Sequence, residues 1–206
     1  MKTGAEASLR EAARSLARER AAREYLLKNT REAVSLCSQS ILAVHAGDIA
    51  SAEKKAARAR SLISRHRRRA TGRLAGYMTV PEQEFTEASA LIAVARGRPV
   101  PSMKSLDVRP EPYVLGLLDC IGELKRMILD RIRAGRTGEA DGVFEVMDAL
   151  YMQLRQFALY DKVAKEARRK IDVARILVDD ARASVTEEGR RARLIAALEG
   201  GAGDGI

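Results

Sequence analysis

The chain has 206 residues, of which 46% are hydrophobic and 32% are charged. This composition is too apolar for a disordered chain and too charged for a membrane protein. No run of about 18 apolar residues predicts a membrane-spanning helix, and the charged first 20 residues lack the apolar stretch of a secretory signal. Two cysteines, Cys37 and Cys120, are too few for a disulfide framework and fit a reducing, cytoplasmic location.

The charges are unevenly distributed along the chain. Residues 1–75 contain 17 Lys and Arg against 7 Asp and Glu, whereas residues 76–206 contain 20 against 21. The formal net charge of +9 therefore comes from the first third. Arginine predominates there, and its planar guanidinium binds phosphate bidentately. This asymmetry predicts a polyanionic partner.

The pattern of residues predicts an all-α protein, since strand-like alternation is missing and Ala and Arg are abundant. Residues 5–46 predict one helix, which ends at Gly47, and Asp48 caps the next. Its apolar stripe consists of Leu27, Thr30, Val34, Cys37, Ile41 and Val44. About 40 residues span roughly 60 Å, more than the width of a compact domain of this size. We therefore expect this helix to curve or to project into a neighbouring subunit.

A basic helix is predicted from Asp48 to about Arg73, and a third helix runs from Val80–Pro81 to about Arg96. Residues 97–109 contain two prolines and predict a loop. A fourth helix is predicted over residues 110–134, with its apolar face formed by Val114, Leu117, Leu118, Ile121, Leu124, Ile128 and Ile132.

Two further helices follow a turn at residues 135–138. The fifth carries Val143, Met147, Leu150, Leu154 and Phe157, and the sixth carries Val163, Ala167, Ile171, Ala174, Val178, Ala181 and Val185. Thr186 is expected to cap a short last helix. Residues 1–198 then form a single helical domain, and residues 199–206 form a flexible tail.

Two glutamates of the third helix have unusual positions. On a helical wheel, Glu84 and Glu87 lie in or beside the apolar stripe of Ala88, Leu91, Ile92 and Ala95. An uncompensated charge there is costly, and acids three residues apart on a helix repel each other. A bound cation would remove this cost, because hard divalent ions take oxygen ligands.

A second acidic pair, Asp119 and Glu123, shares a face of the fourth helix away from its apolar stripe. Taken alone, such a pair is most often solvated. The neighbouring Gly116, Cys120 and Gly122 are small and permit close approach by another backbone or a ligand. If the two helices are adjacent, four carboxylates converge. Such sites hold Mg²⁺ or Mn²⁺ and activate water against a phosphodiester.

Several segments carry a recognisable pattern. They are GYM at 76–78, QEFTEA at 83–88, EPYVLGLLDCIGELKRM at 111–127, VFEVMDALYMQL at 143–154 and RKIDVAR at 169–175. Together they resemble the translin/TRAX family over roughly residues 20–198. The resemblance implies a translin-like seven-helix bundle with a long first helix, assembled into hollow octamers that bind single-stranded RNA or DNA.

The acids distinguish the two branches of this family. Carried over position by position, the metal-binding and catalytic acids of the TRAX-like branch match Glu84, Glu87, Asp119 and Glu123. The resemblance therefore implies a homo-oligomeric, Mg²⁺-dependent endoribonuclease of single-stranded RNA, with Mn²⁺ as a possible substitute. Either Glu87 or Glu123 is a candidate general base. The alternative function is a translin-like assembly that binds single-stranded RNA or DNA without cleaving it.

The family places RNA-contacting basic and His residues just before the acidic helix. The matching positions here are Arg65, His66, Arg67, Arg68, Arg69 and Arg73. With only 4% aromatic residues, binding is expected to depend on phosphate contacts and on salt. Neighbouring positive charges should lower the pKa of His66, which we expect near a phosphate. His45 is expected to be packed or capping, and Cys37 to be buried.

Overall fold

The computed structural model describes residues 4–201 and is all-α over that range. Seven α-helices are present: α1 (Gly4–His45), α2 (Ile49–Arg67), α3 (Thr79–Ala95), α4 (Met103–Leu106), α5 (Pro110–Arg133), α6 (Thr137–Leu154) and α7 (Ala167–Gly201). Two 3₁₀ helices, η1 (Gly72–Met78) and η2 (Arg155–Tyr160), complete the described chain. The predicted seven-helix bundle with a long first helix is confirmed.

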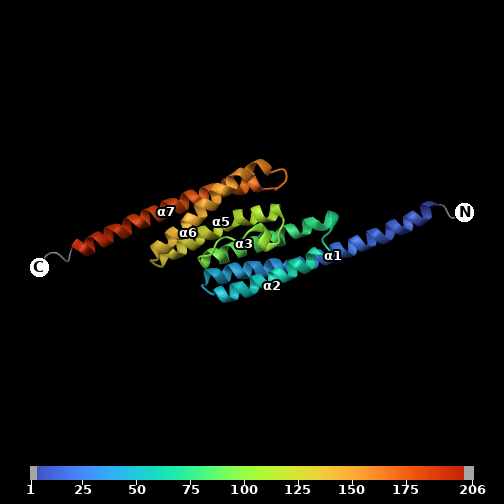
Figure 1. Cartoon of the computed structure of the whole chain (residues 1–206), viewed down its shortest axis with the longest axis horizontal. Coiled ribbons are helices and arrows are strands. Elements are labelled where there is room, and N and C mark those ends of the chain that lie inside the picture. Colours follow the sequence, from blue (N-terminus) through green and yellow to red (C-terminus); the bar gives the residue numbers. More distant parts are fainter. Residues whose placement is uncertain (1–3, 202–206) are drawn as a thin grey trace.

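Helices α3 and α5 lie in the middle of the bundle. The α1–α2 pair packs on α3, while α6 and α7 pack on α5 (Figure 1). More than half of the residues of α3 are consequently buried, including the charged Glu82 and Glu87. The acidic segments identified from the sequence therefore lie side by side at the centre of the fold.

The two longest helices extend beyond the body at opposite ends of the molecule (Figure 1). In α1 no residue from 4 to 21 is buried, and Leu26 is the first with no exposed surface. The end of α7 likewise exposes Leu194, Ile195 and Leu198. Of the two arrangements expected for the first helix, it extends beyond the body instead of curving around it.

The predicted apolar stripes match the core closely in α5 and α7. All the stripe positions of α5 are buried except Ile132, which is partly buried. In α1 the prediction was wrong by one residue at its start, because Leu27 is exposed and Leu26 and Ala33 are buried instead. Alanine and serine fill much of that interface, so large apolar side chains alone located it poorly.

Helix ends were predicted less well than helix positions. The basic helix ends at Arg67 rather than Arg73, because the chain turns there through Arg69 N–H to His66 O and Ala70 N–H to Arg67 O hydrogen bonds. Gly72, with a positive φ of 54°, then begins η1. The proline-containing loop contains the short α4. At the other end, η2 includes Phe157, and Val163 is exposed ahead of α7.

The predicted short last helix does not exist, since α7 continues without a break past Thr186 to Gly201. Residues 199–201 of the predicted tail are thus helical, and residues 202–206 lie outside the described range. Among the helices of residues 4–201, none combines the length and the hydropathy that crossing a membrane requires.

Candidate acidic site and nucleic-acid interface

The backbones of α3 and α5 touch at Gly116. A β-carbon placed on Gly116 would lie 2.3 Å from the carbonyl oxygen of Gln83 and 2.8 Å from the Cβ of Thr86. Only glycine permits this approach. The small residue therefore serves the close backbone packing that the sequence suggested, and it brings the acids of the two helices together.

Three of the four predicted acids line one pocket between α3, α5 and α7. The pocket of about 370 Å³ is bordered by Glu84, Glu87 and Asp119, and from α7 by Arg169 and Lys170. Glu87 is buried, whereas Glu84 and Asp119 are partly exposed. The arrangement places a buried carboxylate next to two that solvent reaches.

The acids in this pocket disfavour one another's charge. Burial, together with the charges of Asp119, Glu84 and Glu123, raises the pKa of Glu87 to about 8. Burial and Asp119 also raise the pKa of Glu84, and Lys170 counteracts the shift at both glutamates. The site therefore holds more negative charge than its surroundings stabilise.

The acids of α5 are held by side chains from other helices. Asp119 accepts a hydrogen bond from Gln83 Nε2 at 2.6 Å and forms an ion pair with Lys170 of α7. Glu123 Oε2 lies 2.6 Å from His45 Nε2, at the end of α1. This contact outweighs the opposing effect of burial and lowers the pKa of Glu123. Glu123 is thus held by α1 and does not line the pocket of the other three acids, although it lies near enough to Glu87 to raise that group's pKa.

Glu84 and Glu87 differ from the acids of α5 in their partners. Neither has a hydrogen-bond or ion-pair partner among residues 4–201. Carboxylate oxygens are the ligands that Mg²⁺ and Mn²⁺ take, so the donor set suits such an ion. Over the same residues, however, no three His, Cys, Asp or Glu side chains are grouped closely enough to hold one. The chemistry of a cation site is present without a ready-made set of ligands.

The predicted basic residues lie at the end of α2 and in the following turn. Arg65, Arg68, Arg69 and Arg73 are exposed. The guanidinium of Arg69 lies over the ring of Tyr25, 3.9 Å from its centre, and Arg73 pairs with Glu19 at 2.6 Å. Arg65, Arg68 and Arg69 therefore present positive charge to solvent at the end of α2, whereas the charge of Arg73, in η1, is paired with Glu19.

His66 is placed differently from its arginine neighbours. It is only 2% exposed, and its Nδ1 lies 3.1 Å from the hydroxyl of Tyr25, while Nε2 has no partner in the described chain. Burial first, and then the charge of Arg65, lower its pKa, in the direction expected from the sequence. Its position inside the protomer does not fit the expected direct contact with a phosphate.

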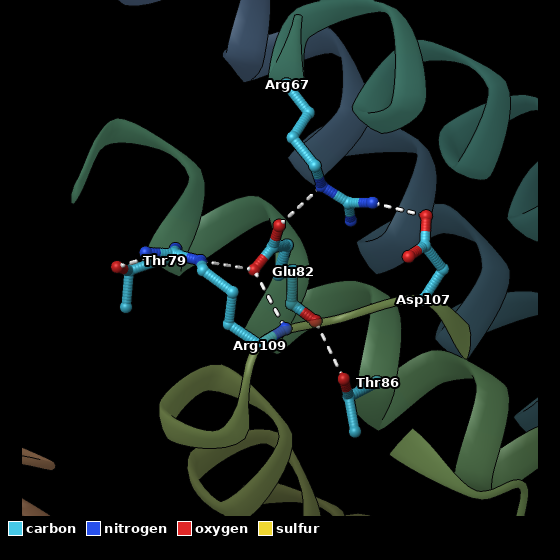
Figure 2. Close-up of polar contacts among 6 residues, drawn as sticks. All are labelled: Arg67, Thr79, Glu82, Thr86, Asp107 and Arg109. Atoms are coloured by element: carbon cyan, nitrogen blue, oxygen red, sulfur yellow. Dashed lines mark hydrogen bonds and ion pairs between the residues drawn. The ribbon is translucent and has the colours of Figure 1, made fainter. Parts of the chain in front are cut away.

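Arg67 belongs to an ion-pair cluster around the buried Glu82, and its own side chain is partly exposed (Figure 2). Glu82, with no exposed side-chain surface, accepts hydrogen bonds from Arg67 Nε at 3.0 Å and from Arg109 Nε at 2.8 Å. Arg67 also pairs with Asp107, and Arg109 donates to Thr79 Oγ1 at 3.1 Å. The cluster joins the end of α2, the first turn of α3 and the start of α5.

Three residues near the acids were not assigned to the site by sequence analysis: His45, Glu82 and Lys170. Lys170 lay inside the recognised RKIDVAR segment, on the same helical face as Ala174 and Leu177, where a charged residue is unusual. Glu82 and His45 lie next to apolar stripes, and only the tertiary structure supplies their partners.

Both cysteines are buried, as expected for Cys37. Burial raises the pKa of the Cys37 thiol to about 12 and that of Cys120 well above its usual range. Neither thiol is therefore ionised at neutral pH, which argues against a cysteine nucleophile beside the acids.

Comparison with known proteins places this arrangement in a family. The Translin family description matches residues 71–179. An uncharacterized protein of Methanocaldococcus jannaschii is 34% identical over 167 residues, covering 80% of this chain and 75% of that protein.

Solved structures agree with this assignment. AfC3PO, in a complex with duplex RNA, is 29% identical with a TM-score of 0.82, covering 91% of this chain and 98% of that one. Apo-NeC3PO, at 19% identity and a TM-score of 0.77 over 87% of this chain and 96% of that one, shares the fold. The chain belongs to the Translin family.

Proposed function

We propose that this protein is a metal-dependent endoribonuclease that cleaves single-stranded RNA at the pocket between α3, α5 and α7. The observation that carries the proposal is the buried Glu87, which faces Asp119 and Glu84 without a partner in residues 4–201 and whose pKa is about 8. A fold is not stabilised by placing such a group there. Its presence at the centre of the bundle supports a functional role.

The acids and His45 have different roles in the proposed reaction. Glu84, Glu87 and Asp119, with Glu123 beside them, would hold Mg²⁺ or Mn²⁺, which supplies Lewis-acid chemistry toward a phosphodiester. Glu87 or Glu123 would accept a proton at a carboxylate oxygen. His45 fixes the orientation of Glu123 through its 2.6 Å contact.

The exposed arginines would position the strand. Arg65, Arg68, Arg69 and Arg73 precede the acid-bearing helix in the chain, are exposed, and would offer guanidinium groups to phosphates. RNA as the polyanion is supported by the complex of the 29% identical AfC3PO with duplex RNA. Because such contacts are made to the backbone, we expect single-stranded DNA to bind as well.

Assembly of several copies belongs to the same proposal. The projecting ends of α1 and α7 expose Leu9, Leu16, Leu194, Ile195 and Leu198, which find no cover within the described protomer. Such faces are buried by association in many oligomers. We propose a homo-oligomer, with the octamer of the family as the expected size, in a cytoplasmic location. Light scattering measures that size.

Incubation of end-labelled single-stranded RNA with the full chain tests the activity. Cleavage is expected with Mg²⁺ and not with EDTA, and Glu87→Ala and Asp119→Ala should abolish it while RNA binding persists. Glu139→Ala is the matched control, since this acid pairs with Arg131 and Arg136 away from the pocket. Unchanged cleavage by both site variants would overturn the assignment.

A second candidate function is RNA binding without turnover. It is favoured by the ion pair of Asp119 with Lys170 and by the lack of a grouped three-ligand set in residues 4–201. EDTA-insensitive binding of RNA, with no cleavage of single-stranded or duplex substrates, would support this function instead.

A further inference from the structure

Lys170 inserts a single positive charge into the acidic pocket. It comes from the first turn of α7, 51 residues away in sequence, and its Nζ contacts Asp119 Oδ1. The other oxygen of Asp119 accepts from Gln83 at 2.6 Å. Both oxygens of the acid that α5 contributes to this pocket are therefore occupied by protein donors.

The charge of Lys170 acts on all three acids of the pocket. Besides its direct contact with Asp119, it is the cationic side chain that favours the ionised forms of Glu84 and Glu87. Arg169 also borders the pocket, but its side chain is 74% exposed and pairs with Glu166 at 3.2 Å. Lys170 is thus the ammonium that pairs with Asp119 and lies close enough to Glu84 and Glu87 to favour their ionised forms.

We propose that Lys170 is a built-in counter-cation of the acidic pocket, which a divalent cation must displace from Asp119 before it can bind there. The inference rests on the proposed function, in that it assigns the same acids to a cation. An ammonium and a divalent ion cannot both lie against one carboxylate without strong repulsion. The grouping of three ligands that residues 4–201 lack would form only after the lysine has left.

The side chain of Lys170 can move away from Asp119. The lysine side chain is 19% exposed, so part of it already reaches solvent, and its four-carbon stem allows the ammonium to swing outward. Since Lys170 belongs to the first turn of α7, cation binding would also release one of the contacts that hold α7 to α5. Binding of a cation in the pocket is therefore expected to break the Lys170–Asp119 contact between α7 and α5.

A matched control exists in the same pair of helices. Lys125 of α5 pairs with Asp180 of α7 at 2.8 Å, outside the acidic pocket. Removing either lysine breaks one Lys–Asp pair between α5 and α7. Only removal of Lys170 also takes positive charge from the acids.

The test is a titration of metal-free full-length protein with Mn²⁺, in which electron paramagnetic resonance measures the free ion. Lys170→Met is expected to bind Mn²⁺ about tenfold more tightly than the wild type, or to bind when the wild type does not. Lys125→Met should match the wild type. Lys170→Arg keeps the charge and should bind no more tightly than the wild type.

The other outcomes overturn the inference. Equal affinity of the wild type and Lys170→Met would do so while leaving the proposed ribonuclease intact, because cleavage is measured separately. Weaker binding by the variant, or no binding by either protein, would also refute it. If Lys170→Met is unfolded by circular dichroism, Lys170→Gln takes its place, since Gln can still donate to Asp119 and carries no charge.

Discussion

Gly116 of α5 lies so close to Gln83 of α3 that an added β-carbon would be 2.3 Å from the carbonyl oxygen of Gln83. This contact sets the distance between the two helices that carry the acids. Glu84 directly follows Gln83, and Asp119 lies about one helical turn after Gly116. The acidic pocket therefore depends on one glycine that carries no chemistry of its own.

Replacing this glycine should be costly. Gly116→Ala is expected to lower the free energy of unfolding by about 1–3 kcal/mol, because the new methyl group meets backbone atoms that cannot move aside. Urea denaturation measures the change. Gly122→Ala, in the same helix, meets only Leu177 Cδ1 at 3.9 Å and should be neutral or stabilising by up to about 1 kcal/mol. Equal stability of the two variants would contradict this view of the interface.

The buried Glu82 should contribute more to stability than an exposed acid with the same number of partners. Glu82→Gln is expected to destabilise the fold by about 2–4 kcal/mol, because it breaks a buried ion pair. The partly exposed arginines limit the loss, because their charges still reach water. Glu53 also pairs with two arginines, Arg96 and Arg98, but at the surface. Glu53→Gln should change the denaturation midpoint little. A similar loss in both variants would argue against a special role for the buried cluster.

His66 should make stability depend on pH. Its pKa in the folded chain lies below the usual 6.5, so below about pH 6.5 the unfolded chain binds a proton that the folded chain does not. Stability should therefore fall with decreasing pH, by up to about 1.4 kcal/mol per pH unit until the folded pKa is reached. Above about pH 6.5, His66 should not make the free energy of unfolding depend on pH.

The measurement is urea denaturation of the wild type and His66→Gln between pH 7.5 and 5. Glutamine cannot be protonated in this range and can still hydrogen bond to Tyr25. The variant should lose less stability on acidification than the wild type. Parallel pH profiles would show that His66 is not responsible.

The exposed arginines should contribute to RNA affinity through phosphates alone. Arg65→Ala and Arg68→Ala are each expected to weaken binding of different single-stranded sequences equally. Each should also make the slope of log K against log salt less negative by about 0.7 per lost phosphate contact. Filter binding at several salt concentrations measures both quantities. Arg193→Ala, at the far end of α7, is the control, and the same slope change there would indicate unspecific charge loss.

The helices and their buried faces followed from the sequence because apolar periodicity is local. The stripe of α5 was predicted almost residue by residue, as was the closeness of Glu84 and Glu87 to the core. The end of α2 was predicted too late in the chain, because the arginines after Arg67 have a high helix propensity. The positive φ of Gly72 depends on packing, which the local pattern does not contain. Local pattern thus located the helices better than their ends.

The partners of the acids could not be predicted, since each comes from a distant part of the chain. His45 reaches Glu123 across 78 residues and Lys170 reaches Asp119 across 51. Glu82 and Arg67 are only 15 residues apart, yet no sequence pattern indicated that they form a pair. The sequence therefore pointed to Glu84, Glu87 and Asp119, which line one pocket, without indicating which side chains pair with the acids.

The most direct test of the acidic pocket as the cleavage site is the single-turnover cleavage rate of single-stranded RNA by Glu87→Gln, Asp119→Asn and the double variant. If the two acids work in one site, each single change should slow cleavage at least about 100-fold. The double variant should be scarcely slower than the slower single variant, because residues that act as a unit are not additive. Wild-type rates in either single variant, with RNA still bound, would contradict the assignment of this pocket as the site of cleavage.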